Sequence, residues 1–303
     1  MTLLLIGPSE RGRVWRQIFD EAGEPMVFGE DAVDDPKAVS HLACWNPSDD
    51  LGRYPNLKTV ISVGAGVDQM PPMPQGVALV RTLAPSVDEM VRDWVLMATL
   101  MLYRDMPRYL AQASEGEWRA HPPQRASAGR VGIMGLGRIG RAVAEVAGAL
   151  GFDVAGWSRS GAPVAGVDVY GPDDLEPFLA RTDLLICLLP LTDETRGLLS
   201  SRVFAMLPRG AALVHAGRGA QLDMEAMRAA LDDGHLKSAM LDVTEPEPLP
   251  KDHWAWQDPR VIVTPHIGGQ TDSEEGARHA LAVIRASRTG DDLPGLVHGK
   301  KGY

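Results

Sequence analysis

The sequence predicts an α/β protein built from two doubly wound parallel-sheet domains. Three observations support this class. Short apolar runs of strand length alternate with helical runs along the 303 residues, which is typical of a parallel sheet covered on both faces. A glycine-rich turn joins a strand to a helix near residues 130–150. A last helical run, residues 273–289, lies beyond the central strands and returns most simply to the first domain.

The first third of the chain reads as a small sheet followed by a long helix. The predicted strands are residues 2–6, 42–45, 59–63 and 77–80, with a helix at 11–22. The long helical run covers residues 87–106. Ser86 and Glu89 have capping-box spacing at its start, and Pro107 ends it. Its middle, residues 94–102, is apolar nearly all round, so we expect it to be buried.

The middle of the chain reads as one complete doubly wound domain. After the strand that begins at residue 130, the predicted strands are 153–157, 184–189, 211–215, 239–243 and 261–264, and the predicted helices are 142–150, 173–181 and 222–233. We therefore divide the chain into a first domain, residues 1–98 and 269–303, and a second domain, residues 99–268, inserted into it.

The segment from residue 130 to 140 contains the spacing G-x-G-x-x-G between a buried strand and a helix. The first glycine permits the tight turn, the second lets a pyrophosphate approach the backbone, and the third lets the helix pack closely on the strand. Free N–H groups and the dipole at the helix start favour phosphate binding. The segment therefore predicts a dinucleotide site that includes Gly135, Gly137, Arg138, Ile139 and Gly140.

The end of the next strand indicates which dinucleotide is bound. NAD sites usually place an acid there to hold the ribose 2′-hydroxyl. This chain has Ser158, Arg159 and Ser160 instead. A guanidinium between two hydroxyls suits a 2′-phosphate through charge-assisted hydrogen bonds. We therefore predict NADPH or NADP⁺ as the cofactor, with NADH as a poorer alternative; a solvated surface arginine is the simpler interpretation.

Composition limits the class of protein and its partners. A hydrophobic share of 45% and a charged share of 23% are those of a soluble globular protein. A net charge of −10 argues against nucleic acid as a partner. Cys44 and Cys187 lie in apolar runs, which indicates buried inert thiols and neither a metal site nor a disulfide. The first residues lack the features of a signal peptide and no apolar stretch is long enough for a membrane, so we expect a cytoplasmic protein.

Three ionisable residues each follow a predicted strand of the second domain. They are Arg218, Glu247 and His266. Ligands of doubly wound sheets bind at the carboxyl ends of the strands. A surface arginine, a loop glutamate and a helix-capping histidine would each be ordinary alone. Three of them on successive strand ends predict a catalytic site.

The order of motifs along the chain resembles the D-isomer-specific 2-hydroxyacid dehydrogenases. The motifs are G-x-G-x-x-G, PLTDET (190–195), AGRG (216–219), LDVTEPEPLP (241–250) and TPHIGG (264–269). Within that family, WSRS (157–160), SVGAGVDQM (62–70) and the ending Gly302-Tyr303 resemble the bacterial glyoxylate/hydroxypyruvate reductase A group. The resemblance implies a Rossmann cofactor domain inserted into a flavodoxin-like substrate domain, and a homodimer.

The resemblance also implies a chemistry with which these residues agree. Hydride attacks the keto carbon of a 2-keto acid, and negative charge develops on the keto oxygen. His266, as imidazolium, would protonate that oxygen. Glu247 would hold the ring and favour its charged form, and Arg218 would polarise the ketone and grip the carboxylate.

The expected reactions are glyoxylate to glycolate and hydroxypyruvate to D-glycerate. Two alternatives remain. One is a reductase for another 2-keto acid, such as pyruvate or a branched or aromatic one. The other, from a different class, is a nucleotide-sensing binding protein like the corepressors of this superfamily.

The remaining predicted site residues come from loops that flank these motifs. Further cofactor contacts are expected from Leu189, Pro190, Thr195, Ala216, Gly217, Asp242, Gly268 and Gly269. The substrate is expected to contact Trp45, Val63, Gly64, Ala65 and Gly66, whose backbone N–H groups can form a concave anion site, together with Arg218 and His266. For the glycines a plain turn, and for Trp45 and Trp118 a packed aromatic, is the alternative.

Three further positions near the predicted site, Glu245, His215 and Gly217, affect the choice of its acid and base. The family's E-P-L-P pattern favours Glu247 over Glu245 as the partner of His266. His215 stands where the family most often has Asn, and Gly217 stands where it often has Ala. This departure places a second imidazole near the cofactor, so His215 is the alternative acid.

Overall fold

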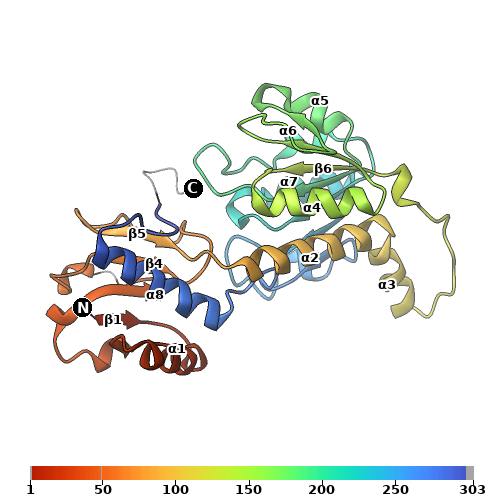
Figure 1. Ribbon diagram of the computed structural model, residues 1–303. Coiled ribbons are helices and arrows are strands. Elements are labelled where there is room, and N and C mark those ends of the chain that lie inside the picture. The colour runs from red at the N-terminus through yellow and green to blue at the C-terminus, as the bar shows by residue number, and fades with distance from the viewer. Residues whose placement is uncertain (1, 49, 298–303) are drawn as a thin grey trace. The chain divides into compact units, whose positions relative to one another are not determined.

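A computed structural model describes residues 2–48 and 50–297, which form two compact units. Unit 1 combines the chain up to Val87 with the residues from Gln270 onward, and unit 2 is Asp88–Gly269 (Figure 1). The α/β class is confirmed, and the last helix belongs to unit 1. The Gly302-Tyr303 ending lies outside the described residues. The boundaries at 98/99 and 268/269 stay a prediction about folding domains.

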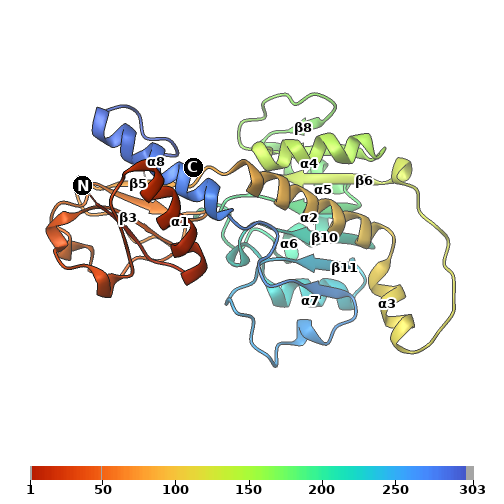
Figure 2. The same cartoon turned by 60° about the horizontal axis from the view of Figure 1, so that its bottom comes forward.

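Unit 1 contains a five-stranded parallel sheet in the order β2-β1-β3-β4-β5. Its strands are β1 (Thr2–Leu5), β2 (Met26–Phe28), β3 (Val39–Cys44), β4 (Thr59–Ser62) and β5 (Ala78–Arg81). This is the flavodoxin-like order, as the resemblance implies. The helices α1 (Ser9–Ala22) and α8 (Ser273–Thr289) lie side by side (Figure 2). Trp15 of α1 packs against Gly276 of α8, where a Cβ would lie 3.2 Å from its ring.

Unit 2 contains a seven-stranded parallel sheet in the order β12-β11-β10-β9-β6-β7-β8. Its strands are β6 (Arg130–Met134), β7 (Asp153–Trp157), β8 (Asp168–Tyr170), β9 (Leu184–Cys187), β10 (Ala211–His215), β11 (Leu236–Leu241) and β12 (Val261–Val263). The strand order reverses between β6 and β9, which is the switch point where doubly wound sheets bind ligands.

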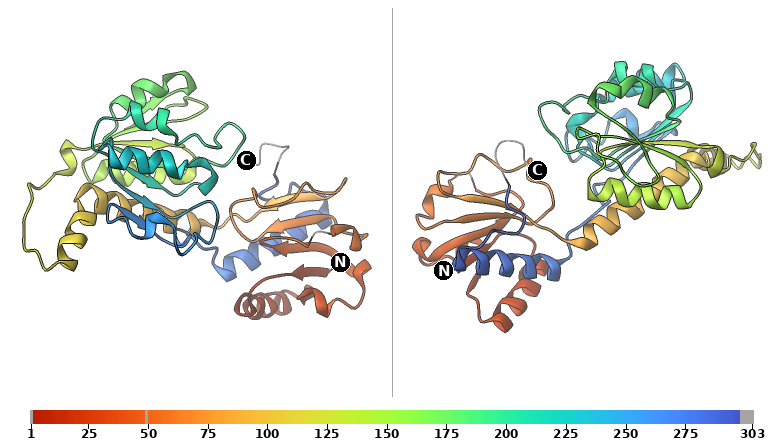
Figure 3. Two further views of the ribbon diagram at one scale, coloured as in Figure 1. Left: turned by 180° about the vertical axis from the view of Figure 1, so that it is seen from behind. Right: turned by 45° about the horizontal axis from the view of Figure 1, so that its top comes forward.

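Helices cover both faces of the sheet in unit 2. One hydrophobic core joins the sheet to α2 (Pro85–Tyr103) and α4 (Arg138–Ala149). The other joins it to α5 (Leu175–Ala180), α6 (Ser201–Met206) and α7 (Met224–Asp232). The two helical layers are visible in Figure 3. Because both faces are covered, strands such as β9 and β10 consist entirely of buried residues, which explains their unbroken apolar pattern.

The predictions for the long helix were partly wrong. It begins at Pro85, and the Ser86 hydroxyl donates to the Glu275 carboxylate at 2.6 Å instead of capping the helix. It ends at Tyr103, and Pro107 instead lies in the first turn of α3 (Met106–Ser114), where a missing N–H costs nothing.

The expected burial of α2 holds for only one side of the helix. Val95 is completely buried, whereas Met97 is 43% exposed and Leu100 is 39% exposed. The apolar composition of residues 94–102 therefore leaves an uncovered side on the outer face of α2.

Both cysteines are free and fully buried, as predicted. Burial raises the pKa of the Cys44 thiol and that of the Cys187 thiol to about 12, so neither is a nucleophile at neutral pH. Within residues 2–48 and 50–297, no helix has the length and apolarity needed to span a bilayer. The same residues contain no cluster of three or more histidine, cysteine or acidic side chains placed to bind a metal ion.

Candidate active site

The glycine turn between β6 and α4 has the shape that phosphate binding requires. Gly135 has a φ of 103°, a conformation that favours glycine. A Cβ on Gly140 would overlap the carbonyl oxygen of Gly135, so only glycine permits this close packing. Gly137 is the N-cap of α4, and a Cβ added there would have no neighbour within 4 Å. The turn therefore leaves open space in front of the first N–H groups of α4, where an anion binds favourably.

The residues after β7 fit a phosphate-bearing ribose. The Ser158 hydroxyl is buried and has no hydrogen-bond partner among the described residues. A buried polar group without a partner is costly, and a ligand oxygen would satisfy it. Arg159 is exposed beside it. Arg138, by contrast, pairs with Asp88 of α2 at 3.1 Å, so its side chain already has a partner within the protein.

The loop after β9 is organised by its own hydroxyl and by one residue that the sequence did not single out. Thr195 donates to the Pro190 carbonyl at 2.7 Å and accepts the Thr192 N–H at 2.8 Å. Gln221 donates to the same carbonyl at 2.9 Å and to that of Leu189 at 3.2 Å. The loop that contains Leu189, Pro190 and Thr195 is thus fixed from within unit 2.

Arg218 follows β10 in a loop packed tightly against the residues after β11. Its Nη1 donates to the Gly217 carbonyl at 2.8 Å. A Cβ on Gly219 would overlap the backbone of Thr244, so glycine is required here. This close approach brings the loop that contains Arg218 next to the loop that leads to Glu247.

Asp242 organises the loop that presents His266. It is 3% exposed, and its Oδ1 accepts from the Thr264 hydroxyl at 2.6 Å and from the Ile267 N–H at 2.9 Å. Its Oδ2 accepts the Gly268 N–H at 2.7 Å. Within this turn His266 has a φ of 52°, a left-handed conformation uncommon for a residue other than glycine. The observed contacts of Asp242 are with this turn, and its contact with the nicotinamide carboxamide stays a prediction.

His266 and Glu247 form a hydrogen-bonded pair, with 2.9 Å between Nδ1 and Oε2. Because a carboxylate only accepts, Nδ1 of His266 is a donor. Glu247 is held in turn by the Thr244 N–H at 3.1 Å. The structure therefore brings Glu247, and not Glu245, to the ring. Nε2 of His266 makes no hydrogen bond within the part of the chain that the structure describes, and the side chain is 33% exposed.

The pair also alters both pKa values in the direction of an ion pair. The hydrogen bond that His266 donates to Glu247 raises the pKa of His266 above its ordinary value, against the lowering effect of burial. Burial alone would raise the pKa of Glu247, but the hydrogen bonds from His266 and Thr244 outweigh it and lower that pKa. The charged imidazolium is therefore favoured.

His215 differs from His266 in each of these respects. It is completely buried, and its Nε2 lies 2.9 Å from the Arg218 carbonyl, which can only accept. Burial lowers its pKa to about 4. His215 is therefore neutral at neutral pH, and its proton is engaged with the backbone. This geometry favours His266 as the acid.

The predicted substrate residues Trp45 and 63–66 belong to unit 1. Trp45 is 44% exposed, and its ring packs on Gly64, where a Cβ would lie 2.5 Å from Cζ3. The close packing of the tryptophan ring therefore requires glycine at position 64. The Ser62 hydroxyl donates to the Gly66 carbonyl at 2.7 Å and shapes the loop. Trp118 of unit 2 is fully exposed.

Comparisons with known proteins show the family to which the chain belongs. A family model of the D-isomer specific 2-hydroxyacid dehydrogenase NAD binding domain matches residues 96–268. Glyoxylate/hydroxypyruvate reductase A of Serratia proteamaculans strain 568 is 34% identical over 279 residues, which are 89% of each chain. Glyoxylate/hydroxypyruvate reductase A of Salmonella paratyphi B is 32% identical over 312 residues, which cover both chains completely.

Solved structures give the same result. The NADPH-dependent glyoxylate/hydroxypyruvate reductase of Sinorhizobium meliloti, in complex with NADP and sulfate, has a TM-score of 0.93 and 34% identity over the whole of both chains. A D-isomer specific 2-hydroxyacid dehydrogenase from Xanthobacter autotrophicus Py2, in complex with NADPH and MES, has a TM-score of 0.90 and 34% identity. That match covers 100% of this chain and 99% of the other.

Proposed function

This chain belongs to the D-isomer-specific 2-hydroxyacid dehydrogenase family, and we propose that it reduces small 2-keto acids with NADPH, glyoxylate and hydroxypyruvate first among them. The observation that carries the proposal is the hydrogen bond between His266 and Glu247, beside Arg218, at the edge of the sheet that also carries the glycine turn. The products are glycolate and D-glycerate.

The reaction needs a proton as well as a hydride. When held at the glycine turn, NADPH would supply the hydride that the keto carbon accepts. The keto oxygen then gains negative charge, and the Nε2–H of the His266 imidazolium donates a proton to it. Glu247 keeps the ring oriented and stabilises its charged form before the transfer. General acid catalysis of this kind contributes about 10²–10⁴-fold to the rate.

Arg218 binds the other end of the substrate. Its planar guanidinium presents a fork of donors that matches a carboxylate and can also polarise the neighbouring ketone. In unit 1, the backbone N–H groups of residues 63–66 are proposed as an anion site suited to a carboxylate. On the cofactor side, the glycine turn would hold the pyrophosphate, and Ser158 and Arg159 the 2′-phosphate.

The experiment that tests the function is NADPH oxidation with a panel of 2-keto acids. Glyoxylate and hydroxypyruvate should give the highest kcat/KM. Faster turnover of pyruvate or of a branched or aromatic keto acid would assign the enzyme to another substrate. Tight NADPH binding without turnover of any keto acid would favour the nucleotide-sensing alternative.

The choice of cofactor is tested separately at Arg159. Loss of a charged hydrogen-bond partner costs about 1.5–3 kcal/mol, so Arg159→Ala should weaken NADPH binding about 10–100-fold and NADH binding little. Arg202→Ala, which removes an exposed arginine of α6, is the matched control. Equal losses with both cofactors would show that Arg159 does not contact the 2′-phosphate.

The proposed functional form is a homodimer. The support in this chain is the uncovered apolar side of α2, where Met90, Met97 and Leu100 are 37–43% exposed. Exposed apolar patches of this kind commonly mark interfaces between proteins. Sedimentation or light scattering should give twice the mass of one chain, and Met97→Glu with Leu100→Glu should reduce it.

A further inference from the structure

The backbone of Arg218 is held from two sides by buried polar side chains. Nε2 of His215 donates to the Arg218 carbonyl at 2.9 Å. Oε1 of Gln221 accepts the Arg218 N–H at 2.8 Å. Both His215 and Gln221 are completely buried. We call these two residues the Arg218 clamp, because together they bind both polar groups of that residue's backbone.

The orientation of Gln221 is fixed by what surrounds its amide group. While Oε1 accepts the Arg218 N–H, Nε2 donates to the carbonyls of Pro190 and Leu189 at 2.9 and 3.2 Å. A flipped amide would place its donor against an N–H and its acceptor against two carbonyls, so only one orientation is satisfied. Gln221 therefore ties Arg218 to the loop after β9.

Gly217 belongs to the same arrangement. A Cβ at this position would overlap Oε1 of Gln221 and lie 3.3 Å from Cε1 of His215. The end of a glutamine side chain can usually move aside, but here that movement would break its hydrogen bond to Arg218. His215 and Gly217, which stand where the family most often has Asn and often has Ala, are thus parts of one packing arrangement around Arg218.

We propose that His215 and Gln221 are positioning residues that fix the direction of the Arg218 guanidinium and thereby set the affinity for the 2-keto acid. This inference rests on the proposed function of Arg218. A long arginine side chain transmits a small shift of its backbone to the guanidinium, and misplacement by about 1 Å can cost about 10²-fold in rate. The clamp prevents that shift without touching the substrate.

The main test is Gln221→Met, which keeps the length of the side chain and removes its hydrogen bonds. We expect kcat/KM for glyoxylate to fall about 10–100-fold, mostly through KM. The Kd of NADPH should rise less than the KM for glyoxylate, although Gln221 also donates to the carbonyls of Leu189 and Pro190. The alkaline limb of the pH profile should stay close to its wild-type position, because the hydrogen bond between His266 and Glu247 is left in place. If NADPH affinity falls as much as kcat/KM in Gln221→Met, Gln221 does not act through Arg218.

Two variants test His215, one that keeps an N–H donor and one that removes it. His215→Gln places an amide N–H near the position of Nε2 and should retain most of the activity. His215→Leu removes the donor and should raise KM. His41→Gln is the matched control, because His41 is also fully buried, in β3 of unit 1, and burial lowers its pKa to about 4. If His215→Leu and His41→Gln have the same kinetics, the clamp has no role in positioning.

Two measurements separate failure of this inference from failure of the proposed function. In an Arg218→Ala background, clamp variants should reduce activity less than about twofold further, because residues that act as a unit are not additive. Amide hydrogen exchange within residues 216–222 should accelerate in Gln221→Met. Faster exchange with wild-type kinetics would overturn the positioning role alone. A wild type that reduces no 2-keto acid would overturn the proposed function, and the positioning role with it.

Discussion

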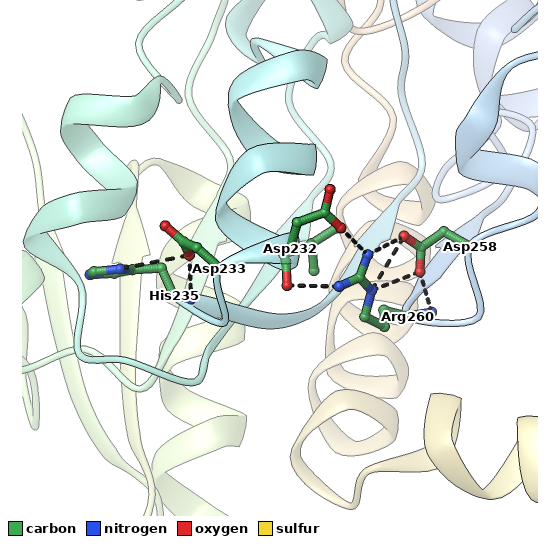
Figure 4. Close-up of polar contacts among 6 residues, drawn as sticks. Asp232, Asp233, His235, Asp258 and Arg260 are labelled. Atoms are coloured by element: carbon green, nitrogen blue, oxygen red, sulfur yellow. Dashed lines mark hydrogen bonds and ion pairs between the residues drawn. The ribbon is translucent and has the colours of Figure 1, made fainter.

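The two ends of strand β12 carry charged clusters that differ in how completely their hydrogen bonds are used. Arg260 precedes the strand and lies among Asp258, Asp232 and the end of α7 (Figure 4). His266 follows the strand and pairs with Glu247. Both clusters are ionic and partly exposed, so charge and burial alone do not distinguish a structural cluster from a candidate catalytic one.

The Arg260 cluster is saturated. Nε and Nη2 of Arg260 bind the two carboxylate oxygens of Asp258 at 2.9 and 2.6 Å. Nη2 also binds Asp232 at 2.7 Å, and Nη1 donates to the Leu231 carbonyl at 2.7 Å. Every nitrogen of the guanidinium therefore has a partner within the protein. Such a group fastens the end of α7 to the start of β12.

The His266 cluster is half satisfied. One ring nitrogen binds Glu247, and the other has no partner in the described part of the chain. The backbone of His266 is also held at a φ of 52°, a conformation of the kind that clusters at functional sites. An available ring nitrogen on an oriented imidazole whose protonated form is stabilised is what a general acid requires. The two clusters therefore differ in whether a nitrogen remains available to bind a ligand.

The largest effect is expected from removing the His266 side chain. His266→Ala should lower kcat about 10²–10⁴-fold and abolish the alkaline limb of the reduction profile. The free energy of unfolding should change little, because the ring is partly exposed. Measurement of kcat against pH decides this prediction. If the limb survives in His266→Ala and vanishes in His215→Ala, the acid is His215.

A second large effect is expected at Arg218. Arg218→Lys keeps the charge but loses the planar fork, so kcat/KM for keto acids should fall about 10–10²-fold. NADPH affinity, measured by fluorescence titration, should remain almost unchanged. Near-wild-type turnover in this variant would remove Arg218 from the catalytic site and leave it as a structural cation like Arg260.

The sequence predicted the His266 cluster as a site because its residues directly follow predicted strands. Arg218, Glu247 and His266 each follow an apolar run, and parallel strands end at one edge of a sheet. The contacts of Gln221 could not be predicted, because its partners are backbone carbonyls about 30 residues away in the chain. Strands β2 and β8, of three residues each, were not predicted.

A smaller effect, on stability and not on activity, is expected at the saturated cluster. Arg260→Met should lower the free energy of unfolding by about 1–3 kcal/mol, because it leaves the carboxylate of Asp258 without its charged partner. Turnover should stay within about twofold of the wild type. Arg278→Met, which breaks an exposed ion pair with Glu274 on α8, should cost only about 0.3–0.5 kcal/mol.

The stability loss in Arg260→Met should also depend on pH. The hydrogen bond from Arg260 lowers the pKa of Asp258, so its contribution to stability is present above the ordinary aspartate pKa of about 3.9. That contribution is lost as the pH falls through the lower, folded-state value. Denaturant unfolding between about pH 7 and pH 3 should therefore show the difference between wild type and Arg260→Met shrinking as the pH falls.

The smallest effect is expected from Glu247→Gln, which removes the charge of the pair and keeps an oxygen that can accept from Nδ1. Glu247 raises the pKa of His266, so wild-type reduction should persist above the ordinary histidine pKa of about 6.5 and fall as the pH rises through the raised value. In the variant the fall should move to lower pH, with a few-fold loss at about pH 8 and almost none at about pH 6. Oxidation of the hydroxy acid needs the neutral ring, so its rise should begin at lower pH in the variant.

Glu245→Gln, which removes an acid two residues away, should leave both profiles in place. If the two variants behave alike, Glu247 does not set the charge of His266, and the half-satisfied cluster would be as inert as the saturated one.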